Sequence, residues 1–138
     1  GLSLICSKAS QEGYRIYLSG QGADEIISDY GFQGNKIYSH SQFGGLFPFN
    51  LAGFWPWVSF YDGTQIKYLN KEEYVAGHYG IETRYPFLDK YLVQEFLWLD
   101  STLKNSKYKS SLDEYLVRNN FPYARGQKIG FNTLKDLR

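Results

Sequence analysis

The chain has 138 residues, and 15 Lys and Arg stand against 14 Asp and Glu, so its net charge is +1. This length fits one domain or a piece of a larger one, and the balanced charge excludes a protein that binds nucleic acid through a basic surplus. A single cysteine, Cys6, excludes a disulfide framework and a cysteine-rich zinc site and favours a reducing compartment, so we expect a cytoplasmic location. Position 1 is Gly and Met is absent, so we expect a processed chain or one cut from something longer, and no signal peptide opens it.

The first residues alternate between helix and strand signals. Apolar residues at helical spacing predict a short helix over residues 2–12, with Gly13 as its C-terminal cap. β-branched and aromatic residues predict a buried strand over 14–18, which a glycine-containing break at 19–22 ends. A helix is predicted over 23–30, with acids in its first turn where the helix dipole favours them. This order is half of a parallel α/β unit.

An uncharged, aromatic run follows a predicted loop. Residues 31–45 are polar and glycine-rich, and the overlapping run 41–61 has eight aromatic side chains and no charge. Pro48 and Pro56 interrupt any membrane-spanning helix, and a flat interfacial anchor would carry Lys or Arg on its polar side. We therefore expect no membrane partner and predict that the run packs in the core or against a neighbour. Exposed, it would form an apolar patch, so self-association or a homodimer is expected.

A long helix and an extended segment come next. Residues 64–79 are predicted to form a helix, with Thr64 as a candidate cap and Gly80 as its stop. Residues 82–88 are predicted to be extended around Pro86, because proline disfavours helix at the residue before it.

Two further helices are predicted towards the end of the chain. Asp89 can cap a helix over 90–99. Ser110 and Asp113 resemble a capping box, with Asp in place of Glu, for a helix from 110 to 119 or 120. The sum is five helices and one or two strands. Because a single parallel strand forms no sheet, the fold class predicted is an α/β fragment that is predominantly helical.

The sharpest chemical signal is the run Leu-Ser-Gly-Gln-Gly-Ala-Asp-Glu over residues 18–25. Gly20 and Gly22 would let backbone N–H groups approach a phosphate, and the helix start adds partial positive charge. An acid there requires a cation between it and the phosphate, which makes Asp24 a candidate Mg²⁺ ligand. The alternative is a tight turn with an acid that stabilises the helix dipole, and short Gly-x-Gly patterns leave both open.

Two other motifs carry charge. In the run Gly-Ile-Glu-Thr-Arg-Tyr-Pro-Phe-Leu-Asp over residues 80–89, charged residues alternate with apolar ones. We predict that Glu82, Arg84 and Asp89 form a semi-buried, structural ion network. The run Arg-Gly-Gln-Lys-Ile-Gly-Phe over residues 125–131 places Lys128 where it could enter a cleft as a point charge for phosphate, or lie in a solvated tail.

In this order, the three motifs resemble those of the asparagine synthetase family. That family has a Leu-Ser-Gly-x-Gly-x-Asp-Glu loop, then a Gly-(Ile/Leu)-Glu-x-Arg-x-Pro-Phe-Leu-Asp block and a Lys-x-x-Phe tail. The resemblance covers about residues 2–131, and the first two motifs together are specific. It implies the C-terminal portion of an adenine-nucleotide α-hydrolase-like (ATP-pyrophosphatase) domain with one or two parallel strands. Residues 1–138 would then be one partial domain of the synthetase.

The resemblance implies part of an ATP-dependent, amide-forming ligase. Aspartate is activated by ATP as an acyl-adenylate, pyrophosphate leaves, and ammonia made from glutamine in a separate domain attacks. The substrates would be aspartate, ATP and ammonia, with ATP and Mg²⁺ as the implied cofactors. The implied nucleotide-binding residues are Ser19, Gly20, Gly22 and Asp24, and Asp24 would hold Mg²⁺ and pyrophosphate.

The implied catalytic residues lie in three parts of the chain. Lys128 would neutralise the leaving pyrophosphate. Glu72 or Glu73 would match a carboxylate that assists amine attack. Gln21 stands where well-studied members of the family have Glu, and a neutral amide cannot act as a base.

Several family features are not in this sequence. Residues 28–30 are Ser-Asp-Tyr where the family has Gly-Gly-Tyr, and the sequence contains no Ser-Gly-Gly-x-Asp-Ser phosphate loop. The N-terminal catalytic Cys of the glutaminase domain is also absent. Because the missing phosphate loop should supply most pyrophosphate contacts, we expect this chain by itself not to turn over ATP. Two alternatives therefore stay open: a ligase of the same fold that acts on another carboxylate, and a non-catalytic packing module with a vestigial nucleotide loop.

Overall fold

The structure is a computed structural model that describes residues 1–62 and 64–125, and about half of the chain is helical. The helices are α1 (Leu2–Gln11), α2 (Ala23–Ile27), α3 (Val58–Tyr61), α4 (Thr64–His78), α5 (Lys90–Trp98), α6 (Ser101–Asn105) and α7 (Ser110–Arg118), with short 3-10 turns η1 (Leu51–Gly53) and η2 (Pro86–Leu88). The strands are β1 (Ile16–Leu18) and β4 (Glu82–Arg84), which pair in parallel, and the antiparallel pair β2 (Gly31–Phe32) and β3 (Asn35–Lys36). These elements agree with the predicted α/β fragment of helices and two parallel strands.

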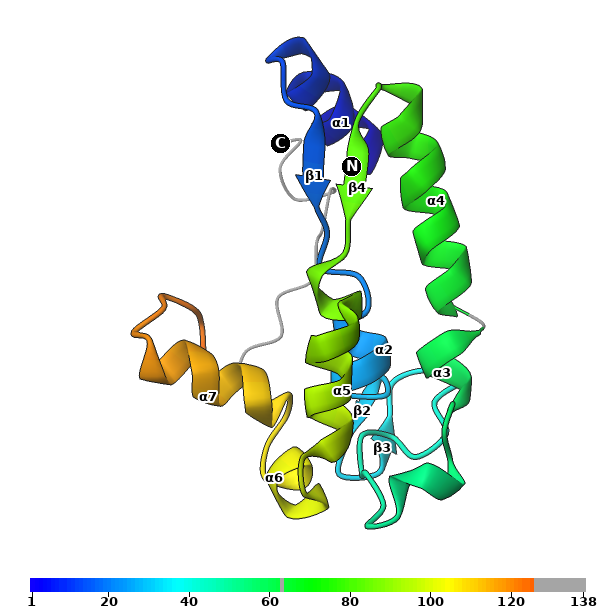
Figure 1. Cartoon of the computed structure of the whole chain (residues 1–138), viewed down its shortest axis with the longest axis vertical. Helices are drawn as coiled ribbons and strands as arrows, with labels where there is room; N and C mark the ends of the chain where they lie inside the picture. The colour runs from blue at the N-terminus through cyan, green and yellow to red at the C-terminus, as the bar shows by residue number, and fades with distance from the viewer. Residues whose placement is uncertain (63, 126–138) are drawn as a thin grey trace.

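One end of the molecule is built around the parallel pair of β1 and β4, flanked by α1 and α4 (Figure 1). Cys6, Ala76 and Ile81 form a small buried core there, with Tyr17 packed against it. Tyr17, which is partly buried, pairs in register with the buried Thr83, so these two residues share the covered face of the sheet. The two helices therefore cover one face of the sheet only.

The other face of the sheet is open. Ile16 and Leu18 are 59% and 67% exposed, and their register partners Glu82 and Arg84 are exposed as well. The predicted buried strand over 14–18 is thus wrong about burial. The described helices cover only the side on which Tyr17 lies.

The aromatic run supplies much of the core at the other end of the molecule. The buried cluster there consists of Ile26, Ile27, Phe47, Leu51, Trp57, Phe60 and Phe96. Trp57 is fully buried, and its ring makes edge contacts with the rings of Phe43, Phe47 and Phe60. The prediction of core packing is confirmed for these residues.

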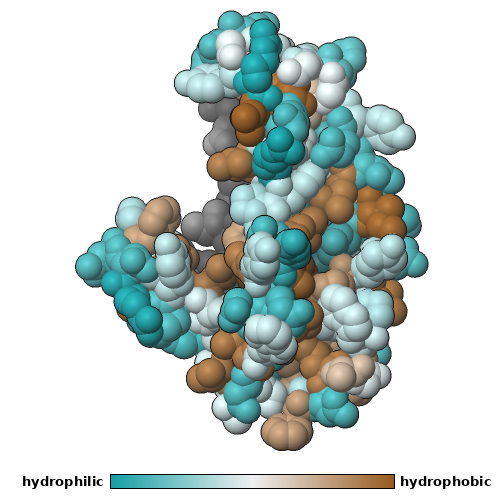
Figure 2. All heavy atoms as spheres, viewed as in Figure 1, coloured by the Kyte–Doolittle hydropathy of each residue, from teal (hydrophilic) through white to brown (hydrophobic). Residues whose placement is uncertain are grey.

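The rest of the run lies at the surface. Phe49 is 90% exposed and Tyr61 is 69% exposed, while Phe54 and Trp55 are less so. Figure 2 shows hydrophobic residues between hydrophilic ones over this end of the molecule. Within residues 1–62 and 64–125, no helix is long and apolar enough to cross a bilayer.

The helix predicted over 23–30 is shorter in the structure, because α2 ends at Ile27. Asp29 and Tyr30 take positive φ values of 43° and 53° and turn the chain. A β2–β3 hairpin follows inside the predicted loop. Its two connecting residues, Gln33 and Gly34, have φ values of 50° and 81°, as tight hairpin turns require.

The elements after residue 80 differ from prediction in two places. The segment predicted as extended over 82–88 is strand only to Arg84, and Pro86 then opens the turn η2. The short helix α6 was not predicted, although Asp100 caps it by accepting a 2.7 Å hydrogen bond from the Thr102 N–H. Asp89 caps α5 as predicted, accepting from the N–H groups of Tyr91 and Leu92 at 2.9 and 3.2 Å.

The capping box predicted at the start of α7 does not form. The N-terminal cap is Lys109, in the left-handed conformation with φ 49°. The Ser110 hydroxyl donates back to the carbonyl of Leu103 at 2.6 Å, and the Asp113 carboxylate binds side chains outside the helix. Ser110 and Asp113 therefore bond to groups of α6 and of the chain after α7, and do not bond to each other's backbone as a capping box requires.

Candidate functional site

The predicted motif over residues 18–25, which we call the glycine loop, lies where the two parallel strands end side by side. Ser19 continues the pairing, since its N–H donates to the Arg84 carbonyl at 2.9 Å. Ligands of open parallel sheets bind outside the carboxyl ends of the strands. The loop and the segment after β4 therefore lie at the carboxyl ends of the two strands, where a ligand is expected.

A buried glutamate on α4 holds the loop. The Glu72 carboxylate accepts a 2.5 Å hydrogen bond from the Ser19 hydroxyl and a 3.3 Å bond from the Gln21 side-chain amide. The Gln21 N–H donates to the Ser19 oxygen at 3.2 Å, which closes the turn. Both oxygens of Glu72 are thus occupied by loop residues that lie about 50 positions away in the sequence. The structure brings together three of the predicted site residues.

The Glu72 carboxylate affects the pKa values of two side chains in the small core beside it. Burial raises the pKa of the Tyr17 phenol, and the nearby Glu72 carboxylate raises it further. Burial and the same carboxylate also raise the pKa of the Cys6 thiol. Cys6 therefore stays a protonated thiol at neutral pH, which agrees with a packing role.

The two glycines of the loop have different environments. A Cβ on Gly20 would meet no atom within 4 Å, so the backbone there is open to an approaching group. Gly22 has φ 95°, and a Cβ on it would lie 2.3 Å from Leu88. Its N–H donates to the Glu25 carboxylate at 3.1 Å, which joins the loop to the first turn of α2.

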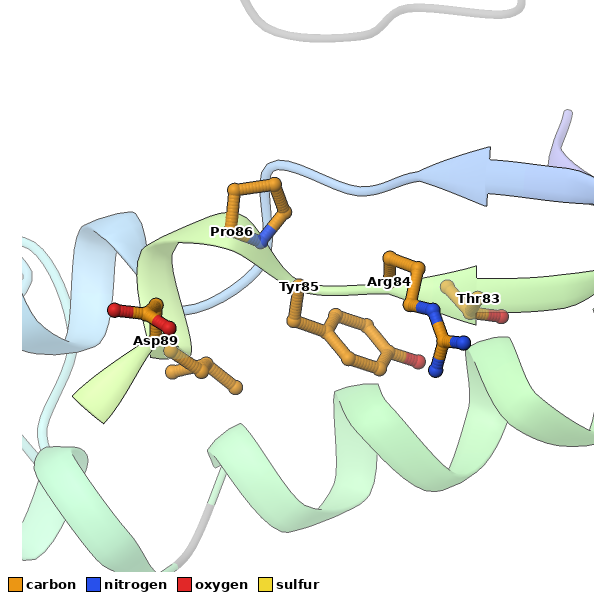
Figure 3. Close-up of a pocket in the computed structure, with 6 residues that line it drawn as sticks. Thr83, Arg84, Tyr85, Pro86 and Asp89 are labelled. Atoms are coloured by element: carbon orange, nitrogen blue, oxygen red, sulfur yellow. The ribbon is translucent and has the colours of Figure 1, made fainter. Parts of the chain in front are cut away.

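Glu73, the second predicted carboxylate on α4, lies outside this network. It accepts a 2.8 Å hydrogen bond from the Tyr85 hydroxyl. Burial raises the pKa of Tyr85, and the bond to Glu73 raises it further, so the phenol remains a donor at neutral pH. In Figure 3 the Tyr85 ring lies between the end of β4 and α4. No sequence pattern predicts the contact between Tyr85 and Glu73.

Tyr85 lines an open depression of about 430 Å³ at the end of β4. Its other lining residues are Thr83, Arg84, Pro86, Leu88 and Asp89. The predicted ion network of Glu82, Arg84 and Asp89 is wrong for Asp89, which caps α5 at the far end of the depression (Figure 3). Arg84 pairs with Glu82 at 2.6 Å, and both side chains are more than half exposed. The two charges are solvated because none of the described elements covers that face of the sheet.

Asp24, the predicted metal ligand, is engaged by a lysine. Its carboxylate lies 2.6 Å from the Lys109 ammonium and accepts a 3.4 Å hydrogen bond from the Tyr108 hydroxyl. No group of three His, Cys, Asp or Glu side chains that could hold a metal ion occurs in the described part of the chain. Lys109 supplies the positive charge beside Asp24.

Two residues complete the comparison with prediction. Lys128 lies outside the described residues. Lys109 was not predicted, because the sequence does not show that residues 107–109 lie beside the glycine loop.

The site as a whole is a strand-end loop that is anchored on Glu72 and bordered by an open depression and a lysine. Its side chains can donate to and neutralise an anion, and two carboxylates on α4 can accept protons. Comparisons of the chain with protein-family models, with curated proteins and with solved structures found no match.

Proposed function

We propose that the chain is part of an ATP-dependent, amide-forming ligase similar to glutamine-hydrolysing asparagine synthetase. The observation that carries the proposal is the anchored loop at the carboxyl ends of two adjacent parallel strands, with Ser19 and Gln21 bonded to Glu72. The order of the three motifs along the sequence supports it. A reaction that uses ATP beside a reduced Cys6 suits the cytoplasm.

The loop would receive the phosphates of ATP. Gly20 leaves the backbone open, and the bonds to Glu72 set the shape of the loop before a ligand arrives. Such preorganisation lowers the cost of binding. Mg²⁺ would arrive as part of the nucleotide substrate, and we assign no step to it.

The reaction would proceed in two displacements. An oxygen of the aspartate side-chain carboxylate attacks the α-phosphorus of ATP, which forms the acyl-adenylate and releases pyrophosphate. Ammonia then attacks the acyl carbon and AMP leaves. Lys128 would neutralise the pyrophosphate, and Glu72 or Glu73 would accept the proton that the attacking ammonia loses. The carboxylate substrate is taken from the resemblance, and another carboxylate on the same fold is the alternative.

Binding of nucleotide phosphates by this 138-residue chain tests the proposal. Titration calorimetry with ATP and with inorganic pyrophosphate should detect binding, and Gly20→Ala should weaken it by roughly tenfold, which is about 1.4 kcal/mol. The added methyl group meets no protein atom, so the melting temperature should not change.

Gly53→Ala is the matched control, because a Cβ on Gly53 also meets no atom within 4 Å and Gly53 lies in η1, away from the loop. Equal effects of the two variants, or no binding by the parent chain, would favour the packing module over the ligase.

A further inference from the structure

The open depression at the end of β4 is not used by the proposed function. Its volume of about 430 Å³ lies in the range of small-molecule sites, and all of its lining residues fall within 83–89. None of them belongs to the glycine loop. The depression is therefore a candidate for a second ligand site that does not depend on ATP.

Charges of opposite sign stand at the two ends of the depression. Figure 3 shows Arg84 at one end, Asp89 at the other, and the Tyr85 ring between them. Pro86 and Leu88 belong to the same lining, so the middle of the depression is largely apolar. A ligand that matches this order has an anionic group, an apolar body and a cationic group.

Arg84, at the cationic end, can bind a second anion. Its Nη2 lies 2.6 Å from a Glu82 oxygen, and the side chain is 59% exposed. A guanidinium has five N–H donors in a planar fork, so the pair with Glu82 leaves donors for another carboxylate. A ligand carboxylate can therefore bind Arg84 while the pair with Glu82 remains.

Thr83 places an unsatisfied polar atom in the same lining. The residue is 5% exposed, and its buried hydroxyl oxygen has no hydrogen-bond partner among the described residues. The Tyr85 hydroxyl, which lies near it, donates to Glu73 instead. Buried polar atoms are nearly always paired in folded proteins, so an unpaired one in the lining of a depression indicates a place that a ligand completes.

Asp89, at the anionic end, keeps one oxygen free of the helix cap. Its Oδ1 accepts both cap hydrogen bonds, from the N–H groups of Tyr91 and Leu92. The residue is exposed, and it forms no ion pair with any described Lys or Arg. A ligand ammonium can therefore donate to Oδ2 as a charge-assisted hydrogen bond and leave the cap intact.

The spacing of the two charges selects the kind of ligand. Arg84 and Asp89 are separated by one extended residue and the turn η2. A strand residue advances about 3.3 Å and a 3-10 residue about 2 Å, so their Cα atoms are roughly 13 Å apart at most. Arg84 pairs with Glu82 and not with Asp89, so the two charges are held apart. An α-amino acid carries both charged groups on one carbon, whereas this depression fits a molecule with its charges at opposite ends of a carbon chain.

We propose that the depression binds an ω-amino acid. The ligand carboxylate lies against the Arg84 guanidinium, and its ammonium meets Asp89. Its methylene chain packs on the apolar middle of the depression. Binding at this site goes beyond the proposed function and requires no nucleotide.

NMR titration of the isotope-labelled 138-residue chain tests the site with three probes of equal chain length: ε-aminocaproate, caproate and n-hexylamine. The amide signals of residues 83–89 should move, and those of the glycine loop should not. ε-Aminocaproate should bind several-fold more tightly than either probe that lacks one charge. It should also bind more tightly than γ-aminobutyrate, whose chain is too short to reach both ends.

Each end is tested by a variant that removes one charge. Arg84→Gln should weaken binding of ε-aminocaproate by roughly tenfold and leave binding of n-hexylamine unchanged. Asp89→Asn should weaken it similarly and leave caproate unchanged, and the fold should tolerate this change because Asn is also a good helix cap. Glu95→Gln on α5 and Arg118→Gln on α7 are the matched controls, since both side chains are exposed and lie outside the depression.

Glu82→Gln gives a prediction in the opposite direction. It releases Arg84 from its ion pair, so caproate and ε-aminocaproate should both bind a few-fold more tightly. The proposal is overturned if the three probes bind equally, if ε-aminocaproate moves no signal in residues 83–89, or if the control variants weaken binding as much as Arg84→Gln and Asp89→Asn do. None of these outcomes bears on nucleotide binding at the glycine loop.

Discussion

At the scale of single residues, the Gln21–Glu72 hydrogen bond explains why an amide at position 21 suits this chain. The Gln21 nitrogen donates to a Glu72 oxygen at 3.3 Å, while the other oxygen accepts from Ser19. A carboxylate at position 21 would face the buried carboxylate at the same distance with no cation between them among the described contacts. Like charges at this range cannot both remain ionised without a cost.

We therefore expect Gln21→Glu to destabilise the protein in a pH-dependent way. In the folded state, the pKa of the introduced carboxyl should lie above its value in the unfolded chain, which is about 4.3. A raised folded-state pKa means that the folded state binds more protons, so stability falls as pH rises through that value. Urea unfolding should show near-parental stability at about pH 4 and a loss of about 1–2 kcal/mol at pH 7, since one pKa unit is worth about 1.4 kcal/mol.

Gln94→Glu is the control for this variant. Gln94 is exposed on α5, so this substitution introduces the same charge in contact with solvent. If the two variants follow the same pH dependence, the Gln21–Glu72 contact does not govern the loop.

Gly22 is expected to be needed for folding, in contrast to Gly20. A Cβ at position 22 would lie 2.3 Å from Leu88 at a φ of 95°, so Gly22→Ala combines a steric overlap with backbone strain. We expect a loss of roughly 1–3 kcal/mol in the free energy of unfolding. Gly20→Ala, measured in the same urea titration, should cost little, and equal losses at both positions would contradict the geometry.

At the scale of elements, Asp29 attaches the aromatic run to the end of α2. Its buried carboxylate accepts from the N–H groups of Phe43 and Gly44 at 2.8 and 3.1 Å, from the Ser41 hydroxyl at 3.0 Å, and from the Ser59 hydroxyl. These donors come from two separate stretches of the run. One side chain therefore fixes how the run folds back on α2.

We expect Asp29→Ala to be among the most destabilising substitutions in the chain. It leaves several buried donors unsatisfied, and each costs about 1–3 kcal/mol, so a total loss of at least about 3 kcal/mol is expected. Urea unfolding followed by tryptophan fluorescence is suitable, because Trp57 lies fully buried in the same core. Glu95→Ala on the exposed side of α5 is the control and should change stability little. A loss below about 1 kcal/mol at Asp29 would show that other contacts hold the run.

These contacts also explain which elements could be read from the sequence. Helices α1, α4 and α5 were predicted to within about two residues, because apolar periodicity, Asp89 and Gly80 are local signals. The early end of α2 was missed because it depends on contacts distant in the sequence. The Asp29 side chain accepts hydrogen bonds from residues 12 to 30 positions away, and the helix ends before it. The β2–β3 hairpin was missed because strands of two residues carry no alternation to detect.

The sequence predicted several residues of the candidate site, but not the hydrogen bonds and ion pairs between them. Local pattern predicted the glycine loop, and family resemblance pointed to Glu72 or Glu73 without choosing between them. Only the fold brings Glu72 to Ser19 and turns Glu73 to Tyr85. The Lys109–Asp24 pair joins residues from separate helices, so no local rule could assign it.

At the scale of the whole molecule, the face of the parallel sheet opposite Tyr17 is an apolar surface that the described elements leave uncovered. Ile16 and Leu18 are exposed there, and both strands of the described sheet have an unpaired edge. Exposed strand edges beside apolar side chains favour pairing with another chain. The aromatic run, from which self-association was predicted, buries Phe47, Trp57 and Phe60 and leaves Phe49, Phe54, Trp55 and Tyr61 exposed. We take the sheet face as the first candidate because it combines apolar side chains with unpaired strand edges.

We expect the chain to self-associate through this face, with a dissociation constant at or below the millimolar range, which corresponds to about −4 kcal/mol. Sedimentation velocity over a concentration series measures it. Ile16→Lys should shift the protein towards monomer, and the fold should tolerate it, because Glu82 is the register partner of Ile16 and supplies an opposite charge. Phe49→Lys removes the most exposed aromatic of the run, and Tyr74→Lys changes an 80% exposed residue on α4, so neither should alter association. Loss of association in Phe49→Lys alone would return the contact to the aromatic run, and a monomer at every concentration would exclude both surfaces.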